Sequence, residues 1–127
     1  MKNVVVNDVD LSKGIKKLVA EGAIINCTSH AVNIFDDDGG EVITILPSGI
    51  EARCSTEVVE LAPGFIETKY GDVEGLPEEE SGKLLIVSAL VRTREPLRFD
   101  LIGPDTSPQG KVLDDQGKLK GVKRFTL

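Results

Sequence analysis

His30 is the only histidine of the chain, and it lies in a polar stretch between two segments with the pattern of strands. Any Ser-His-Asp or Cys-His mechanism within one chain must therefore use His30 as its base. A zinc site built from several histidines of one chain is excluded. Because Thr28 lies two residues before His30 at this strand junction, we expect both side chains to contact a small ligand. The competing interpretation is a histidine in a surface turn, or one whose hydrogen bonds are satisfied in the core.

Arginines form the second group with binding chemistry, because a guanidinium can hold a phosphate or carboxylate through two parallel hydrogen bonds. Arg92 follows the most apolar segment of the chain, at a position where loops commonly carry sites. Arg98 lies two residues before Asp100, so these two residues can instead form an ion pair on one strand face. The expected ligand-binding arginines are Arg53, Arg92 and Arg98, with Arg94 and Arg124 as further candidates.

No segment contains a complete catalytic or metal-binding motif. Ser48 lacks the G-x-S-x-G surroundings of an activated serine, and nothing near Cys27 in the sequence indicates a lowered thiol pKa. Three successive aspartates, residues 36–38, suggest calcium, but their spacing does not fit an EF-hand loop, and Asp-Gly-Gly is typical of a tight turn. We therefore predict no catalytic residue, no metal and no cofactor, and keep a hydrolase that uses His30 as an alternative.

Residues 71–83 are predicted to form a long acidic loop, with three glycines, one proline and three successive glutamates. It is not a phosphate-binding loop, because the Lys-Ser/Thr ending is missing and Asp72 and Glu74 would repel a phosphate. A lid or a subunit-contact loop is the more physical interpretation.

The composition is that of one globular domain: 127 residues, of which 40% are hydrophobic and 28% charged. Only 4% are aromatic, so the core must consist mainly of valine, isoleucine and leucine, which favours strands. The same shortage argues against nucleic acid as a partner, because single strands are usually held by stacking on several aromatic rings.

The charge is unevenly distributed along the chain. Residues 1–91 carry 7 Lys/Arg and 16 Asp/Glu, whereas residues 92–127 carry 8 and 5, which gives net charges of −9 and +3. A basic C-terminal third on an acidic body can meet an anionic ligand. It can equally pair with the protein's own acidic surface or with that of a second subunit.

The first residues lack the apolar run of a signal peptide, and no apolar segment reaches the length of a membrane span. We therefore expect a cytoplasmic protein without membrane contact. In that compartment Cys27 and Cys54, each in an apolar segment, are expected to be reduced and buried.

Apolar runs and turn residues predict roughly eight or nine short strands. Helical spacing of apolar residues predicts one short helix over residues 11–21, which Asp10 or Ser12 can cap and Gly22 can end. The fold class expected for residues 1–127 is mainly β, a small antiparallel barrel or sandwich in a single domain. Segments with strand patterns include residues 4–6, 23–27, 31–36, 41–46, 50–54, 58–61, 65–70, 84–91 and 97–102, with a last hairpin over 111–125.

Some of these segments carry a more specific prediction. Residues 31–36 and 41–46 are expected to pair as a hairpin, and Pro63-Gly64 is expected to form a turn. The run 84–91 is expected to be the central strand and to lead into a short helical turn before Pro96. In 97–102, alternation puts the apolar residues Leu97 and Phe99 on one face and Arg98 on the other.

Several segments of the chain are similar to sequence patterns of a known protein family, and they occur in the same order as in that family. Ile25 to Val32 is similar to I-N-L-T-P-H-x-V. Three middle segments, Pro47 to Arg53, Tyr70 to Pro77 and Ile86 to Val91, are similar to P-S-G-x-x-A-R, Y-G-x-V-x-G-L-P and I-V-S-x-L-V. Three late segments, Arg98 to Leu101, Pro104 to Pro108 and Asp114 to Val122, are similar to R-x-D-L, P-D-T-x-P and D-x-x-G-x-x-x-G-V. Together they resemble a family of small proteins found in bacteriophages, prophages and microbial genomes.

The resemblance covers residues 24–125, which implies a β-rich core over 24–127 and an N-terminal strand-helix addition over 1–23. The chain departs from the family pattern at Cys27 and Ser29, where leucine and proline are usual, and at Leu113, where an arginine is common. The resemblance implies no catalytic residues. It implies a viral accessory role, since small phage proteins often bind host enzymes or sequester host defence signals, several of which are nucleotide derivatives.

These observations predict a small soluble binding protein that holds an anionic, nucleotide-like ligand without turning it over. Its expected contacts are Thr28, His30, Arg53, Arg92 and Arg98. The main alternative is an interaction or assembly module that contacts a host protein through the 71–83 loop and an open strand edge. Because open strand edges are often closed by dimerisation, a homodimer is also expected.

Overall fold

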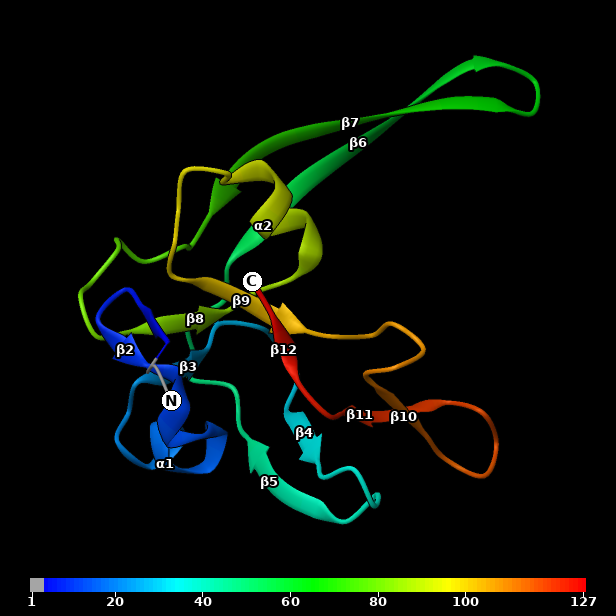
Figure 1. Cartoon of the computed structure of the whole chain (residues 1–127). Coiled ribbons are helices and arrows are strands. Elements are labelled where there is room, and N and C mark those ends of the chain that lie inside the picture. Colours follow the sequence, from blue (N-terminus) through cyan, green and yellow to red (C-terminus); the bar gives the residue numbers. More distant parts are fainter. Residues whose placement is uncertain (1–3) are drawn as a thin grey trace.

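The computed structural model describes residues 4–127 and is mainly β, as predicted (Figure 1). Two short α-helices, α1 (Ile15–Ala20) and α2 (Ala89–Arg94), and one 3-10 helix, η1 (Leu11–Lys13), accompany the strands. The strands are β1 (Val5–Val6), β2 (Val9–Asp10), β3 (Ile24–Asn26), β4 (Val32–Phe35), β5 (Glu41–Ile45), β6 (Arg53–Ala62), β7 (Phe65–Glu74), β8 (Leu84–Ile86), β9 (Leu101–Pro104), β10 (Lys111–Leu113), β11 (Leu119–Val122) and β12 (Phe125–Thr126). They form separate small sheets, and no closed barrel is present within residues 4–127.

The central sheet has the order β12-β9-β8-β3, and β3, β8 and β9 are parallel. The prediction of an antiparallel fold is therefore wrong for these three strands, whereas β12 pairs antiparallel with β9. The inner strand β8 is buried at every position, with Leu84, Leu85 and Ile86 at 1%, 3% and 0% exposure. A continuous apolar run is typical of a parallel strand that is covered on both faces.

Helix α2 makes the parallel pairing of β8 and β9 possible, because it carries the chain from the end of one strand back to the start of the next. The apolar run 84–91 is thus not one strand: β8 ends at Ile86, and the Ser88 side chain accepts a hydrogen bond from the Val91 amide and starts the helix. A helical turn after this run was expected and is confirmed, and Pro96 lies just beyond its end.

A second sheet has the order β10-β11-β4-β5. The predicted hairpin over 31–46 is confirmed as β4 and β5, and the Asp36 side chain accepts the backbone amides of Asp38 and Gly40 in the turn. The aspartate run therefore forms the turn of this hairpin, as predicted.

The predicted helix over 11–21 is divided in two. Gly14 has a φ of +87°, a conformation that glycine adopts without steric cost, and it separates η1 from α1. Val9 and Leu18 are both 3% exposed and pack in the same apolar cluster as Ile24 and Leu84. The N-terminal strand-helix segment is therefore part of the core. None of the helices in residues 4–127 is long and apolar enough to span a membrane.

Strands β6 and β7 form a hairpin that extends away from the body (Figure 1). The predicted Pro63-Gly64 turn is confirmed, but the separate strands expected around it merge into two continuous ten-residue strands. The long loop predicted over 71–83 is correspondingly shorter, because β7 continues to Glu74.

The strand predicted over 97–102 is displaced toward the C-terminus. Leu97 and Phe99, assigned to a buried face from their alternation, are 85% and 71% exposed, and β9 begins only at Leu101. The Arg98 amide donates to the Glu95 carbonyl (3.2 Å), which places this segment in a turn.

Candidate functional site

Three parallel strands end at one edge of the central sheet, which we call the carboxyl edge. In open sheets with parallel strands, ligands bind outside the carboxyl ends of the strands. The segments that leave this edge are 27–30 after β3, 87–88 after β8 and 105–107 after β9. Two adjoining hollows lie here, and they share Val87, Ser88 and Pro104.

The first hollow, the His30 pocket, has a volume of about 510 Å³. It brings together three of the five predicted contacts, Thr28, His30 and Arg53. Apolar residues form much of the remaining wall. They are Ala31, Val32, Ala52, Val87, Leu90 and Pro104. Such a mixed wall suits a ligand with a flat apolar part and a few polar groups.

Asn26 builds the turn that presents His30. Its side chain, 1% exposed, donates to the His30 carbonyl (2.8 Å) and the Ile45 carbonyl (3.1 Å). Its side-chain oxygen Oδ1 accepts hydrogen bonds from the Thr28 amide (3.0 Å) and the Thr28 hydroxyl (2.6 Å). One buried amide therefore fixes the 27–30 turn, and the Thr28 hydroxyl belongs to that turn.

The other two predicted contacts in this pocket have freer side chains. His30 is exposed, and no hydrogen bond of its imidazole occurs within the described residues. Arg53 is 73% exposed and pairs with Glu51 at 3.3 Å. A surface pair of this kind is weak, so Arg53 can be recruited by an anion at little cost.

The second hollow, the Arg92 pocket, has a volume of about 280 Å³. Arg92 is partly buried, and its Nε is a fully buried side-chain nitrogen without a hydrogen-bond partner in the described part of the chain. Gly103 makes room for the guanidinium, since a Cβ there would lie 2.9 Å from Nε. Four hydroxyl-bearing residues line the same pocket: Ser88, Thr106, Ser107 and Thr126. An unpaired buried donor among hydroxyls is suited to an anion.

The one carboxylate of the Arg92 pocket, Asp105, is already neutralised. Its side chain accepts from Arg124 Nε and from the Ser107 amide (3.0 Å). These bonds, that from Arg124 first, lower the pKa of Asp105 from its ordinary 3.8 to about 2. The pocket therefore keeps a positive balance at neutral pH.

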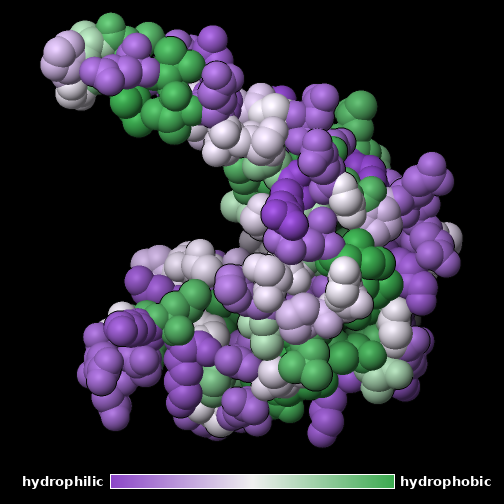
Figure 2. Space-filling view, turned by 180° about the vertical axis from the view of Figure 1, so that it is seen from behind, coloured by the Kyte–Doolittle hydropathy of each residue, from purple (hydrophilic) through white to green (hydrophobic). Residues whose placement is uncertain are grey.

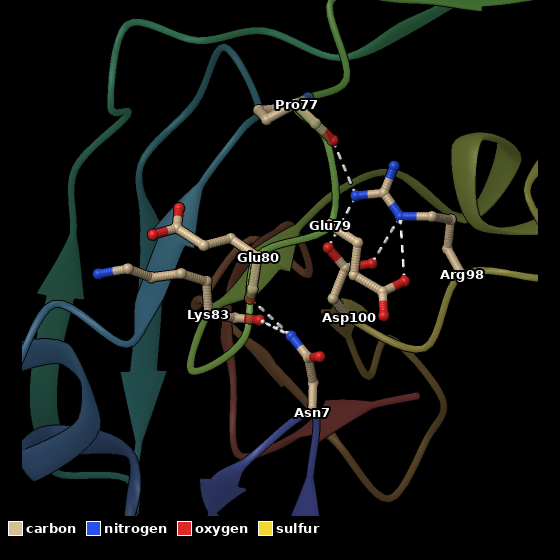
Figure 3. A network of polar contacts seen from close by, with 7 residues as sticks. All are labelled: Asn7, Pro77, Glu79, Glu80, Lys83, Arg98 and Asp100. Atoms are coloured by element: carbon tan, nitrogen blue, oxygen red, sulfur yellow. Dashed lines mark hydrogen bonds and ion pairs between the residues drawn. The ribbon is translucent and has the colours of Figure 1, made fainter.

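Arg98 is placed elsewhere, at the amino end of β9 (Figure 3). Its Nε and Nη2 donate to the two oxygens of Asp100 at 2.8 and 2.7 Å, and Nη2 also donates to the Pro77 carbonyl at 2.8 Å. Asp100 is fully buried, and Glu79 lies 3.6 Å from Arg98 Nε. Together with Arg92, Arg98 lines a third hollow of about 310 Å³, which also includes Glu95. The structure does not bring Arg98 to the His30 pocket, and the pairing with Asp100 that was considered as its alternative is present.

The same corner holds the acidic segment 75–83 in place. The Asn7 amide group donates to the carbonyls of Glu80 (2.9 Å) and Lys83 (2.8 Å), as Figure 3 shows. Arg98 binds this segment at Pro77. The segment is therefore fixed to the body of the protein near both of its ends. It could move as a lid only if these hydrogen bonds were broken.

The arrangement does not assemble a nucleophile with a base. Cys27 is 0% exposed, and burial raises the pKa of its thiol. The Ser48 hydroxyl donates to the Asn26 carbonyl (2.7 Å), and no hydrogen bond joins Cys27 or Ser48 to the His30 ring within residues 4–127. Both cysteines are free, as predicted, although Cys54 is only partly buried. The geometry provides hydrogen-bond donors for binding.

Asn26, Gly103, Thr106 and Ser107 shape the site but are not among the residues predicted from the sequence. Asn26 is the polar end of an apolar strand, and a buried amide at such a position is a usable signal. Gly103 and the Thr106-Ser107 pair gave no local signal, because their role depends on Arg92 from another element. No protein-family model, curated protein or solved structure matches the chain.

Proposed function

We propose that the carboxyl edge binds a small nucleotide-like anion and does not transform it. The observation that carries the proposal is the buried Arg92 Nε without a partner, in a side chain that lines a pocket together with hydroxyl groups at the ends of parallel strands. Leaving a charged donor unsatisfied costs free energy, and a bound phosphate would remove that cost.

The two pockets suit different parts of a nucleotide-like ligand. In the Arg92 pocket, Arg92 and the hydroxyls of Ser88 and Thr106 would donate to phosphate oxygens. In the His30 pocket, Val32 and Leu90 would contact a base or another flat group, with His30 and Arg53 at the rim. Val87 and Pro104 belong to both pockets, so a single ligand of nucleotide size can occupy them together. Arg98 has no part in this proposal.

In biological terms, we propose that the chain is a phage or prophage protein that sequesters a nucleotide signal of the host. This role is supported by the resemblance of segments such as Ile25 to Val32, and by a site made of donors without a paired nucleophile. Sequestration needs affinity and slow release, and it needs no bond to be broken.

The test is a panel of ADP-ribose, a cyclic dinucleotide, ATP, adenosine and inorganic phosphate, measured by thermal shift and calorimetry. A phosphate-bearing nucleotide is expected to stabilise the protein by about 2.7 kcal/mol at one hundred times its dissociation constant, whereas adenosine gives little. Mass analysis after incubation should recover the ligand unchanged. Recovery of a hydrolysed product that depends on His30 would favour the hydrolase instead.

A matched pair of variants on α2 localises the binding. Arg92→Gln removes the guanidinium of the pocket, and Arg94→Gln removes an exposed one from the same helix. Only the first should abolish the thermal shift. No shift with any ligand of the panel, or equal losses in both variants, would contradict the proposed site.

A further inference from the structure

The outer part of the β6–β7 hairpin, residues 56–70, is an arm with almost no cover. Val58, Ile66 and Tyr70 are 60%, 62% and 48% exposed, and Leu61 and Phe65 near the tip are 63% and 68% exposed. Figure 2 shows this projecting part with apolar patches along it. A two-stranded hairpin is at best marginally stable alone in water, and apolar patches of this kind mark interaction surfaces.

The two faces of the arm differ in chemistry. Cross-strand partners share a face, so the pairs Thr56–Tyr70, Val58–Thr68 and Glu60–Ile66 present one face with a single charge. The pairs Glu57–Lys69 and Val59–Glu67 lie on the opposite face, which is mostly charged. The first face has β-branched and aromatic side chains suited to packing, and we call it the packing face.

Charge identifies what this arm fits. The hairpin, residues 53–74, has 2 Lys/Arg and 5 Asp/Glu, a net charge of −3. Residues 111–127 have 5 Lys/Arg and 2 Asp/Glu, a net charge of +3. Both segments project from the same side of the body and leave a hollow between them (Figure 2). The two segments are opposite in net charge and belong to the same chain. On the faces that would meet, the charges are Glu60 of the packing face and Lys120 of β11, which are also opposite in sign.

The basic segment 111–127 borders a groove that side chains of the arm could enter. A hollow of about 210 Å³ lies along β11 and β4, and its lining combines apolar residues with one lysine. Leu119 and Leu113 beside it are 57% and 46% exposed. The residues that line it are Ala31, Val32, Asn33, Pro104, Leu119, Lys120, Gly121 and Val122.

We propose that the packing face of the arm docks on the β11–β4 groove of a second copy of this chain, and that the second copy does the same in return. The arm of one copy cannot fill its own groove without a change of the fold, because the hollow separates them (Figure 2). A reciprocal exchange uses both acidic arms and both basic grooves, and it closes as a symmetric dimer. The groove shares Ala31, Val32 and Pro104 with the His30 pocket, so the dimer is to be measured in the absence of ligand.

The first test compares the two faces of the arm by sedimentation or light scattering at micromolar concentrations. Ile66→Ser with Tyr70→Ser removes apolar contact from the packing face, and should raise the dimer dissociation constant about a hundredfold or more. Glu67→Ser with Lys69→Ser alters the opposite face without changing net charge, and should leave the dimer intact. A monomeric wild-type protein, or equal effects of both variants, would overturn the proposal.

The second test exchanges charges. Glu60→Lys reverses the single charge of the packing face, and Lys120→Glu reverses the lysine of the groove lining. Each variant alone should be a monomer at micromolar concentrations with an unchanged circular dichroism spectrum, because like charges then meet at both contacts. Mixed together, they should form a heterodimer, since each arm then meets a groove of opposite sign. A homodimer that survives either reversal, or a mixture that stays monomeric, would refute the arm-in-groove contact.

Discussion

The two ends of the central parallel sheet each hold an arginine, and the two arginines are in opposite states. At the amino end, Arg98 gives two hydrogen bonds to a fully buried Asp100 and a third to the Pro77 carbonyl. At the carboxyl end, Arg92 has a buried Nε without a partner in the described residues. The donors of Arg98 are used to hold the structure together, whereas Arg92 keeps one donor that nothing in the described residues satisfies.

The comparison explains why residue type alone was an insufficient guide. Arg92 and Arg98 are six positions apart, and both follow the same apolar run. What separates them is the neighbour that the fold provides: a buried carboxylate for Arg98, and Gly103 with hydroxyl groups for Arg92. The predictions below test this difference.

The largest effect is expected on stability from Arg98→Ala. The change leaves the Asp100 charge buried and unpaired, which should lower the free energy of unfolding by about 3–5 kcal/mol in urea denaturation. The double variant Arg98→Met with Asp100→Leu should recover part of this loss. A cost below about 1 kcal/mol would show that the pair is not what clamps this corner.

Arg92→Ala should have the opposite effects: a large loss of ligand affinity and little change in stability. Loss of a charged hydrogen bond corresponds to about 1.5–3 kcal/mol, so ligand affinity measured by calorimetry should fall roughly ten- to a hundredfold. The free energy of unfolding should change little or rise, because an unsatisfied buried donor disappears. A large destabilisation would mean that Arg92, like Arg98, is structural.

Gly103→Ala is expected to act on the ligand through Arg92. The new Cβ would approach Nε at 2.9 Å and Cζ at 3.2 Å, so the guanidinium must move. Affinity should fall about tenfold. In an Arg92→Ala background the same substitution should have no further effect on affinity, which is the outcome of a double-mutant cycle for two residues that act together. Additive losses would show an independent role for Gly103.

The smallest effect concerns Asp105. Because its pKa in the folded protein is lowered from 3.8 to about 2, the pair with Arg124 stabilises the protein above pH 3.8, and this contribution is lost as the pH falls through about 2. Arg124→Gln should raise the pKa of Asp105 toward 3.8 in a carboxyl NMR titration. The variant should also lose less stability than the wild type on acidification. An unchanged titration would remove Arg124 as the cause of the shift.

Local features of the fold were predictable because they depend on neighbours in the sequence. The Asp36 and Pro63-Gly64 turns are set by residues that tolerate or favour turn conformations, and the β4–β5 hairpin follows from alternation between such turns. The alternation of Leu97 and Phe99 misled, since both are exposed in a turn. Periodicity reports which residues share a face, and it does not report what covers that face.

The sequence by itself determined a mainly β chain with a valine-, isoleucine- and leucine-rich core, a basic C-terminal third and the turn that carries His30. Only the tertiary structure decided that β3, β8 and β9 run parallel, that Thr28, His30 and Arg53 meet in one pocket, and that Arg98 belongs to Asp100. The physical reason is that strand pairing and the satisfaction of a buried charge both depend on residues far apart in the chain. Their partners are fixed only when the core closes.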